Sequence, residues 1–437
     1  MSAEVGTNRY EQVKAVPSLE FVFTGLKKSM TDRISGKDLI TFTRTTVGTY
    51  VDENGVIQTA DINEPRFDYD PETGESLGLL IEESRTNSLP YSNTLTGNGA
   101  TGDGWGKNTS TGLPTTEVTL QPNAEIAPDG TFTASKLIQA PTAGLQRWWY
   151  FNFAPRATGW TGSIFAKAAE SDRIVLNVGF GGASVQAIFD LSNVTATYNG
   201  NGTYTSNTTQ TITPYPNGWY KCSISTTVDF GFNVYYQLYF IDENNNTSFQ
   251  GDGVSGIYVW GAQLEQATFP TSYIPTDGTP GCIGRGADVA SITGTNFSSW
   301  YNNSGGTFYA DCNSVDGVNG VFSVGTSTYP NEGLSYDFSS FNSIPADVVL
   351  NGTFNPVGSP HKFAVTSQTG TISLYADGVL QDTDTATNAQ RDGVILVIGN
   401  RSTYGGGISS LYLNGTISRI TYWPVRLADT YLQELTQ

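Results

Sequence analysis

The stretch GIYVWGAQLEQATFPTSYIPTDGTP, residues 256–280, decides how the chain divides into units. Its first ten residues carry apolar side chains at odd positions such as Ile257 and at even positions such as Trp260. A strand that is apolar on both faces is buried on both faces, so we expect Trp260 in a core rather than in the wall of a binding site. Pro270 and Pro275 cannot donate ladder hydrogen bonds and mark the exit from the strand. The stretch is therefore predicted to close one module and to lead into the next.

The segments on both sides of this strand predict an all-β chain in four parts. Residues 91–275 hold runs such as DRIVLNVGF and VYYQLYFID, separated by clusters of Gly, Asn, Asp and Ser, a pattern typical of a jelly roll. Residues 276–292 are predicted as a linker, and residues 293–437 as a second β-sandwich that folds alone. Residues 1–90 form a hairpin-rich region with too little apolar content for its own core, so we expect it to wrap onto the following module.

Local signals predict two hairpins and one helix within these parts. Asn54-Gly55 and Asp377-Gly378 predict tight turns, because residues of these types accept positive φ. The segment LADTYLQELT, residues 427–436, has apolar residues at helical spacing and is predicted as a short helix.

Composition and charge exclude several classes of protein. Charged residues make up only 14% of the 437 residues and aromatic residues 12%, which favours a β-rich chain. The net charge of −18 argues against a nucleic-acid partner, because phosphate binding needs a basic surface. No run of about 18 apolar residues predicts a membrane span. The N-terminal segment MSAEVGTNRYEQVK lacks the apolar core of a signal peptide, so we expect synthesis in the cytoplasm and no export by that route.

The three cysteines are predicted to be free thiols, because three do not build a disulfide framework. Cys222 and Cys312 alternate with apolar residues along strand-like runs and are expected to be small buried side chains. Cys282 lies in the loop PGCIGRG.

Two segments carry a resemblance to a known family. Residues 40–93, ITFTRTTVGTYVDENGVIQTADINEPRFDYDPETGESLGLLIEESRTNSLPYSN, resemble a segment that recurs in bacteriophage virion proteins. There it precedes a carbohydrate-binding-module-like jelly roll that ends in a WGAQLE…TSYIPT strand, as residues 260–276 do here. The runs HKFAVT and ISLYADGVL resemble a concanavalin-like or laminin-G-like sandwich, a fold that serves many functions. In CIGRGADVASI, Gly286 replaces the first Ala of the related linker.

The resemblance implies a virion structural protein with tandem β-sandwiches, a jelly roll followed by a concanavalin-like domain. Three functions stay open: a tail-fibre or spike adhesin that attaches to host-surface glycans, a capsid decoration or head-spike protein with a purely structural role, and a polysaccharide-degrading tailspike enzyme. The implied location is the virion, with other virion proteins as partners and with residues 1–90 as the segment that attaches to the virion or to neighbouring chains. Because phage appendages are usually symmetric, we expect a homo-oligomer, most simply a trimer.

The sequence favours a protein that is not an enzyme. His361 is the sole histidine and begins a strand-like run, where an edge residue is the simpler interpretation than a general base. No G-x-S-x-G, H-E-x-x-H or phosphate-loop motif occurs. Paired carboxylates of the glycosidase type cannot be recognised among 40 acidic residues, many of which lie in turns.

Two oxygen-rich loops are candidate calcium sites, because calcium takes carboxylate and carbonyl ligands. The first loop, IDENNNTSFQGDG, offers Asp242, Glu243, Asn244 and Asp252. The second, ADCNSVDGVNG, offers Asp311, Asn313 and Asp316. Neither loop has the regular twelve-residue spacing, and solvated Asx turns remain the alternative.

The candidate carbohydrate-binding residues are aromatic. The run LQRWWYFNFAPRATGW holds Trp148, Trp149, Tyr150 and Trp160, and sugar rings stack on exposed aromatic faces. Adjacent Trp148 and Trp149 point to opposite faces of a strand, so we expect one of them outside the core. The alternative is burial of that ring at a subunit contact or against the N-terminal region.

Overall fold

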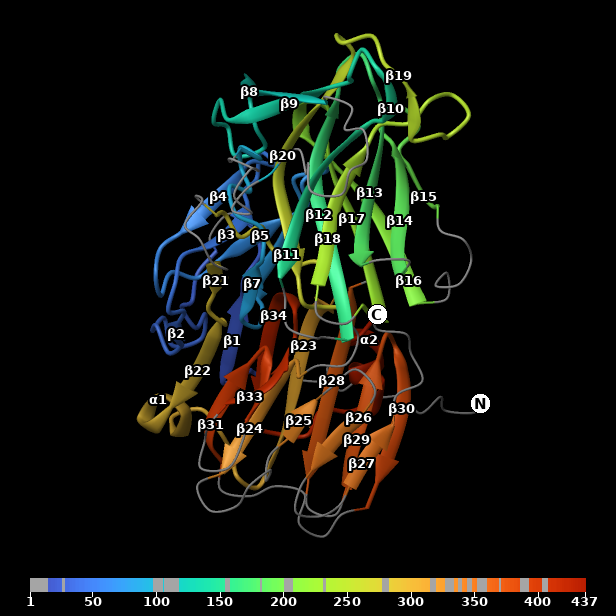
Figure 1. The fold of residues 1–437 in the computed structure, drawn as a ribbon. Helices are drawn as coiled ribbons and strands as arrows, with labels where there is room; N and C mark the ends of the chain where they lie inside the picture. The colour runs from blue at the N-terminus through green and yellow to red at the C-terminus, as the bar shows by residue number, and fades with distance from the viewer. Residues whose placement is uncertain are drawn as a thin grey trace, which may run out of the picture.

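The structure, a computed structural model, describes residues 15–25, 28–96, 105, 118–153, 158–180, 183–199, 207–230, 233–276, 283–314, 320–326, 334–336, 340–343, 348–351, 360–368, 371–385, 393–402 and 408–437. The protein is all-β, and its antiparallel sheets form two β-sandwich lobes, one above the other in Figure 1. No helix in these residues is long and apolar enough to cross a membrane.

The upper lobe of Figure 1 is the jelly roll. Its six-stranded sheet has the order β16 (Thr208–Tyr215), β17 (Trp219–Asp229), β12 (Thr158–Ala168), β20 (Gly256–Glu265), β9 (Ala134–Ile138) and β8 (Thr119–Glu125). Its five-stranded sheet has the order β11 (Arg147–Phe153), β18 (Asn233–Tyr239), β13 (Arg173–Phe180), β14 (Ala183–Asp190) and β15 (Thr195–Tyr198). Alternate residues of both sheets, such as Ile164 and Leu176, fill the core between them. A 3-10 turn, η2 (Pro216–Gly218), and the pair β10 (Ala143–Leu145) and β19 (Ser248–Gln250) complete the lobe.

The closing strand β20 is buried almost throughout, and Trp260 is a core residue as predicted, 1% exposed. Its side-chain alternation changes in mid-strand, which the sequence pattern did not indicate. Gly261 has φ +65°, and the register with β12 shifts there, so that two steps along β12 face three along β20. Because of this bulge, Val259 and Ala262 both face the jelly-roll core, while Trp260 faces a smaller cluster with Phe165.

The lower lobe is the second sandwich. One sheet has the order β30 (Val379–Asp384), β29 (Thr371–Ala376), β28 (His361–Gln368), β23 (Gly305–Ser314), β34 (Gly415–Trp423), β6 (Ser76–Ile81) and β5 (Phe67–Tyr69), with β1 (Leu19–Val22) also paired to β34. The facing sheet has the order β2 (Thr41–Thr43), β22 (Val289–Thr293), β31 (Gly393–Ile398), β24 (Phe322–Thr326), β25 (Leu334–Tyr336), β26 (Ser340–Ser343) and β27 (Val348–Asn351).

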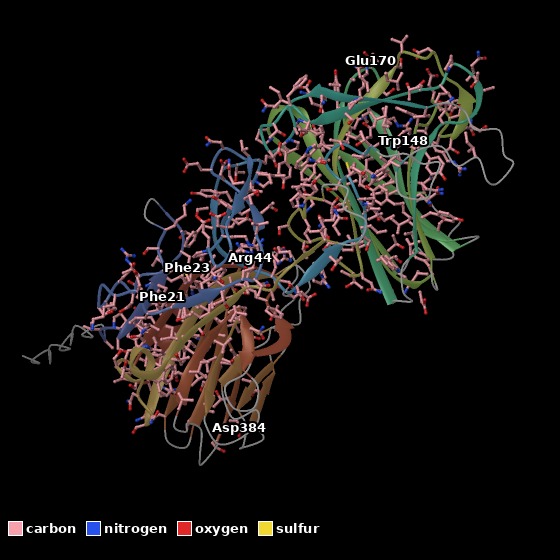
Figure 2. All side chains as sticks on the ribbon, turned by 60° about the vertical axis from the view of Figure 1, so that its left-hand side comes forward. Phe21, Phe23, Arg44, Trp148, Glu170 and Asp384 are labelled. Atoms are coloured by element: carbon pink, nitrogen blue, oxygen red, sulfur yellow. The ribbon has the colours of Figure 1, made fainter. Side chains whose placement is uncertain are left out.

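The N-terminal region does not form a separate unit, because its strands complete the lower sandwich. β1 and β6 pair with successive parts of β34, and β2 pairs with β22. Phe21 and Phe23 lie in the lower core with no exposed surface, and Figure 2 places both within that lobe. The expected linker also differs: residues 276–292 include β21 (Ile283–Arg285), which pairs with β7 (Arg85–Asn87), and most of β22. These strands were not predicted because they are short, lie in segments rich in Gly and Asp, and pair with strands that are distant in sequence.

Several local predictions agree with the structure. Asp377-Gly378 forms a two-residue turn with positive φ at both positions between β29 and β30. Asn54-Gly55 lies in the longer connection between β3 (Gly48–Val51) and β4 (Ile57–Ala60). Remaining elements are α2 (Asp429–Leu435), predicted from its spacing, α1 (Gly294–Ser298), and the paired β32 (Asn400–Ser402) and β33 (Ile408–Tyr412). Cys222 and Cys312 are buried free thiols, whereas Cys282 lies outside the described residues.

Candidate functional site

Two of the four aromatic residues predicted to bind carbohydrate are buried and cannot stack on a sugar ring. Trp160 is 1% exposed and Trp148 is 9% exposed, and both belong to the jelly-roll core, where Figure 2 labels Trp148 among the strands. Their assignment as carbohydrate-binding residues is therefore wrong, because each ring faces the inner side of its sheet. The side chains of Trp149 and Tyr150 lie outside the described part of the structure; their backbones pair with Gln237 and Tyr236 of β18.

The acidic loops use their carboxylates to build turns. Asp242 accepts hydrogen bonds from the backbone N–H of Asn244 and of Asn246, both 2.8 Å, and Asp252 accepts them from Val254 and Ser255. The side-chain hydrogen bond from Ser255 is the main cause that lowers the pKa of Asp252 to about 2. Across the described ranges, no group of three or more acidic, His or Cys side chains is placed to hold a metal ion. Calcium binding at these loops stays a prediction.

The described residues of the second candidate calcium loop do not converge on one site, and His361 contacts a carboxylate. Asp311 lies in β23, Asn313 lines the cavity described below, and Asp316 lies outside the described residues. His361 opens β28, and its Nδ1 lies 2.6 Å from an oxygen of Asp377 in the facing hairpin.

Three amide side chains form a row across the outer face of the five-stranded jelly-roll sheet. Asn177 pairs in register with Gln237 on one side and with Gln186 on the other. Residues one position away, such as Leu176 and Leu238, face the core. Strand alternation therefore places the three amides on the opposite face. There Gln186 is half-buried, whereas Gln237 and Asn177 are buried, 7% and 3% exposed. We call Gln237, Asn177 and Gln186 the amide row.

Hydrogen bonding within the amide row is incomplete. The Nδ2 of Asn177 donates to the Oε1 of Gln237 at 2.7 Å, and the hydroxyl of Tyr239 donates to the same oxygen at 2.7 Å. Within the part of the chain that the structure describes, the Oδ1 of Asn177 is buried without a hydrogen-bond partner. The Nε2 of Gln237 has no partner among the described residues. A buried acceptor without a partner thus lies beside an amide donor that no described residue uses.

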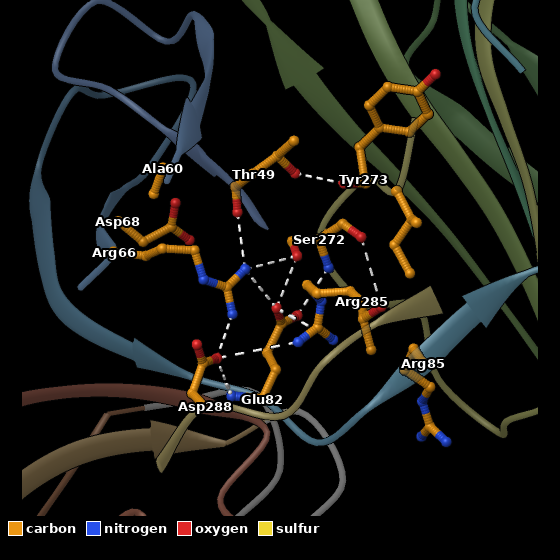
Figure 3. A network of polar contacts seen from close by, with 12 residues as sticks. Thr49, Ala60, Arg66, Asp68, Glu82, Arg85, Ser272, Tyr273, Arg285 and Asp288 are labelled. Carbon is orange, nitrogen blue, oxygen red and sulfur yellow. Dashed lines mark hydrogen bonds and ion pairs between the residues drawn. The ribbon is translucent and has the colours of Figure 1, made fainter. Parts of the chain in front are cut away.

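A buried ionic network joins the N-terminal region to both lobes (Figure 3). Arg66 lies at its centre, with Glu82 at 2.8 Å and Asp288 in direct contact. Arg285 adds a second cation, 3.4 Å from Glu82. The network also includes Arg44, which contacts Asp288 at 3.1 Å, and Ser272, whose N–H and hydroxyl both donate to Glu82 at 2.7 Å.

Charges and hydrogen bonds outweigh the effect of burial on the carboxyl pKa at Glu82, but burial outweighs them at Asp68. Burial alone would raise the pKa of Glu82, but Arg285, Arg66 and the Ser272 hydrogen bonds outweigh it and lower that pKa to about 2. Asp68 has no such set of partners. Burial raises the pKa of Asp68 to about 7, although the Val51 N–H donates to its carboxylate at 2.7 Å and Arg66 lies nearby.

A cavity of about 210 Å³ lies beside the network, and all three regions of the sequence line it. The N-terminal region contributes Tyr50 and Asp68, the jelly roll contributes Phe165, Tyr215 and Lys221, and the lower sandwich contributes Asn313 and Thr416. The cavity is partly open to solvent.

Sequence reasoning missed both the network and the amide row. The network residues stand in the stretches that carry the family resemblance: Arg44, Arg66, Glu82, Ser272, Arg285 and Asp288. A usable signal was a charged residue directly after an apolar run, as in GLLIEE. The amide row had only a weak signal, one polar residue among aromatic and apolar ones in YYQLYF.

No protein-family model matches the sequence, and no curated protein matches it. Among solved structures, the chain is similar to the CBM40 of the IT-sialidase of Ruminococcus gnavus bound to α2,3-sialyllactose, with 15% identity over 32% of this chain and 88% of that one, at a TM-score of 0.27. Domain 4 of an extracellular arabinanase from Geobacillus stearothermophilus, in complex with arabinotriose, is 12% identical over 39% of this chain and 84% of that one, at 0.27. Trypanosoma rangeli sialidase is 12% identical over 69% and 60%, at 0.25. Similarities of this size assign neither ligand nor activity to this chain.

Proposed function

We propose that this chain is a non-enzymatic surface protein that binds glycans through its jelly-roll lobe and is displayed on a bacteriophage virion as a fibre or spike adhesin. The amide row of Gln237, Asn177 and Gln186 is the observation that carries the glycan-binding part. Amides both donate and accept hydrogen bonds, which is what the hydroxyls of a sugar require. The virion part rests on the sequence resemblance of residues 40–93.

The unsatisfied groups favour binding over a purely structural amide ladder. A buried polar group without a partner costs about 1–3 kcal/mol. The Oδ1 of Asn177 is in this state, and the neighbouring Nε2 of Gln237 has two N–H groups to donate. Gln237 and Asn177 are both buried, so a ligand hydroxyl reaches this pair only where the neighbouring side chains move aside. A hydroxyl that then accepts from Gln237 and donates to Asn177 would remove that cost in the complex.

Attachment through such a surface needs several copies. A shallow sheet face buries little of a ligand, and millimolar affinity corresponds to about −4 kcal/mol. Copies held on one particle convert weak single sites into firm attachment through effective concentration. We therefore propose a homo-oligomer, most simply a trimer, whose other partners are virion proteins.

The test removes amides while keeping side-chain size. We expect Gln186→Met and Gln237→Met to lower binding to glycan arrays and host cells, by about 2- to 10-fold per site for one lost hydrogen bond. Gln210→Met is the matched control, because Gln210 is half-buried on β16 of the other sheet. Circular dichroism checks that all three variants fold.

If the two sheet-face variants bind as the parent does, the amide row is not the site, and the capsid-decoration function gains. Labelling of phage particles with an antibody against the chain tests the virion location. Release of reducing ends from host polysaccharide by the purified protein would contradict a non-enzymatic role.

A further inference from the structure

We infer that the cavity between the lobes is a second ligand site, which takes one neutral sugar ring. The inference is independent of the amide row, because the cavity lies beside the ionic network and shares no residue with the row. Its evidence is a set of polar groups from three parts of the chain that converge on one space without satisfying one another.

The first of these groups is the ammonium of Lys221, a half-buried residue. Lys221 projects from β17, and its Nζ donates to the carbonyl oxygen of Thr271 at 2.9 Å. Among the described residues, this is its only hydrogen bond, and no carboxylate lies within ion-pair distance. Burial lowers the pKa of Lys221, although Glu265, Glu82 and Asp68 oppose that shift. An ammonium has three donors, so two N–H groups are available to a ligand.

Three further polar groups on the cavity wall also have unused hydrogen-bonding capacity. The hydroxyl of Tyr215 has no hydrogen-bond partner in the described part of the chain, and the carboxyl of Asp68 accepts only from Val51. The Oδ1 of Asn313 is buried and has no hydrogen-bond partner among the residues described. The cavity therefore offers donors and acceptors together, a combination that suits hydroxyl groups.

An apolar wall completes the site. Phe165 and Tyr215 meet edge to face with ring centroids 5.1 Å apart, and both line the cavity. Aromatic rings beside convergent polar groups are the usual composition of a small-ligand site. Sugar rings combine apolar C–H faces with hydroxyl edges and fit this mixture.

Size and charge narrow the ligand class. The volume of about 210 Å³ exceeds the roughly 150 Å³ of an engineered cavity that binds benzene. It stays below the roughly 300 Å³ at which ordinary ligand pockets begin, so one ring fits and two do not. The charged residues of the lining are Lys221, Glu82 and Asp68. Burial favours the neutral form of Asp68, so the ammonium of Lys221 and the carboxylate of Glu82 balance, and the site favours a neutral ligand over a hexuronic acid.

The experiment titrates the full chain with neutral hexoses, N-acetylhexosamines and hexuronic acids by calorimetry and saturation-transfer NMR. We expect a neutral sugar to bind. Lys221→Met should weaken its binding by about 10-fold or more, and Tyr215→Phe by about 3- to 10-fold, as for charged and neutral hydrogen bonds. The matched controls are Lys167→Met and Tyr258→Phe, whose side chains lie outside the cavity lining. Gln186→Met on the amide row should leave this binding unchanged.

The sugar ring in the cavity could be a free monosaccharide or the end of a glycan chain. Comparing the affinity of each monosaccharide with that of a disaccharide that ends in it distinguishes the two. Equal affinities mean that the cavity accepts the end of a glycan chain, and loss of binding with the disaccharide means that it takes the free sugar. If no sugar of the panel binds, or if Lys221→Met and Tyr215→Phe bind like the parent, the inference is overturned and the cavity holds water only. Unchanged cavity binding in a Gln186→Met variant that has lost glycan-array binding shows two separate sites.

Discussion

At the scale of single residues, the carboxyl groups between the lobes differ in the direction in which folding shifts their pKa. Glu82 is held by Arg66, Arg285 and Ser272, and its folded state strongly favours the ionised form. Asp68 is half-buried and lacks such partners, and burial favours the neutral form of its carboxyl in the folded protein. The same stretch of chain therefore contains two carboxyls with opposite pH dependences.

Glu82→Gln should destabilise the protein at neutral pH and have little effect in acid. The pKa of Glu82 falls from its usual 4.5 to about 2 on folding, which corresponds to about 3 kcal/mol. That stabilisation is complete above the unfolded pKa and is lost as the pH falls through the folded one. Urea denaturation of parent and variant from pH 7 to pH 3 measures the difference, which should shrink with falling pH.

Asp68→Asn is the matched comparison and should show the opposite trend. The folded pKa of about 7 lies above the usual 3.8, so the parent loses up to about 4 kcal/mol as the pH rises between these values. Asparagine keeps an acceptor for the Val51 N–H but carries no charge. The variant should therefore gain stability relative to the parent from pH 4 to pH 8. A constant difference across this range would contradict burial as the cause.

At the scale of elements, β20 shows how one glycine redirects a strand. The bulge at Gly261 lets Val259 and Ala262 face the same core and sends Trp260 to the cluster around Phe165 and Tyr273. The ring centroids of Trp260 and Tyr273 are 4.5 Å apart, so the strand and the exit segment that follows it pack on each other. The bulge thus couples the end of the jelly roll to the connection toward the lower lobe.

Gly261→Ala should destabilise the jelly roll more than an alanine at another glycine with positive φ. A Cβ at position 261 would lie 2.8 Å from the Cδ2 of Phe165, whereas Gly218, with φ +78°, has nothing within 4 Å. Both substitutions impose backbone strain of roughly 1–2 kcal/mol, and only the first adds overpacking of roughly 1–3 kcal/mol. Equilibrium denaturation of the two variants isolates the overpacking. Equal losses would mean that the ring moves aside freely.

At the scale of the whole molecule, the lobes differ in their dependence on the N-terminal region. Both jelly-roll sheets consist of strands between residues 119 and 265. The lower sandwich takes β1, β2, β5 and β6 from the N-terminal region. Arg44 and Arg66 then tie this region to Asp288 in the segment between the lobes, where Figure 2 labels Arg44.

A fragment of residues 290–437 should therefore fail to fold cooperatively, in contrast to the expectation from sequence. It lacks β1 and β6, two of the strands that pair with β34, and the buried Phe21, Phe23, Leu79 and Ile81. A fragment of residues 85–276 is the control and should fold, because it keeps both jelly-roll sheets and Asn87, which donates to Ala262 and Ile274. Thermal unfolding and limited proteolysis of both fragments test this. A protease-resistant 290–437 fragment would contradict it.

The sequence by itself determined the features that depend on neighbours along the chain. Strand alternation and turn residues indicated an all-β protein, the closing strand with buried Trp260, the Asp377-Gly378 turn and the C-terminal helix. Each of these depends on side-chain periodicity or on φ preferences within a few residues.

Only the tertiary structure decided which distant segments meet. Leu19 pairs with Tyr422, and Arg44 contacts Asp288, across separations that local periodicity does not encode. Alternation predicted that Trp148 and Trp149 face opposite ways, but the packing of the two sheets decided that Trp148 faces the core. The amide row and the cavity arise likewise from pairings between segments that are far apart in sequence. The physical reason is that a site is made by convergence of side chains, whereas a sequence pattern reports only the periodicity of one segment at a time.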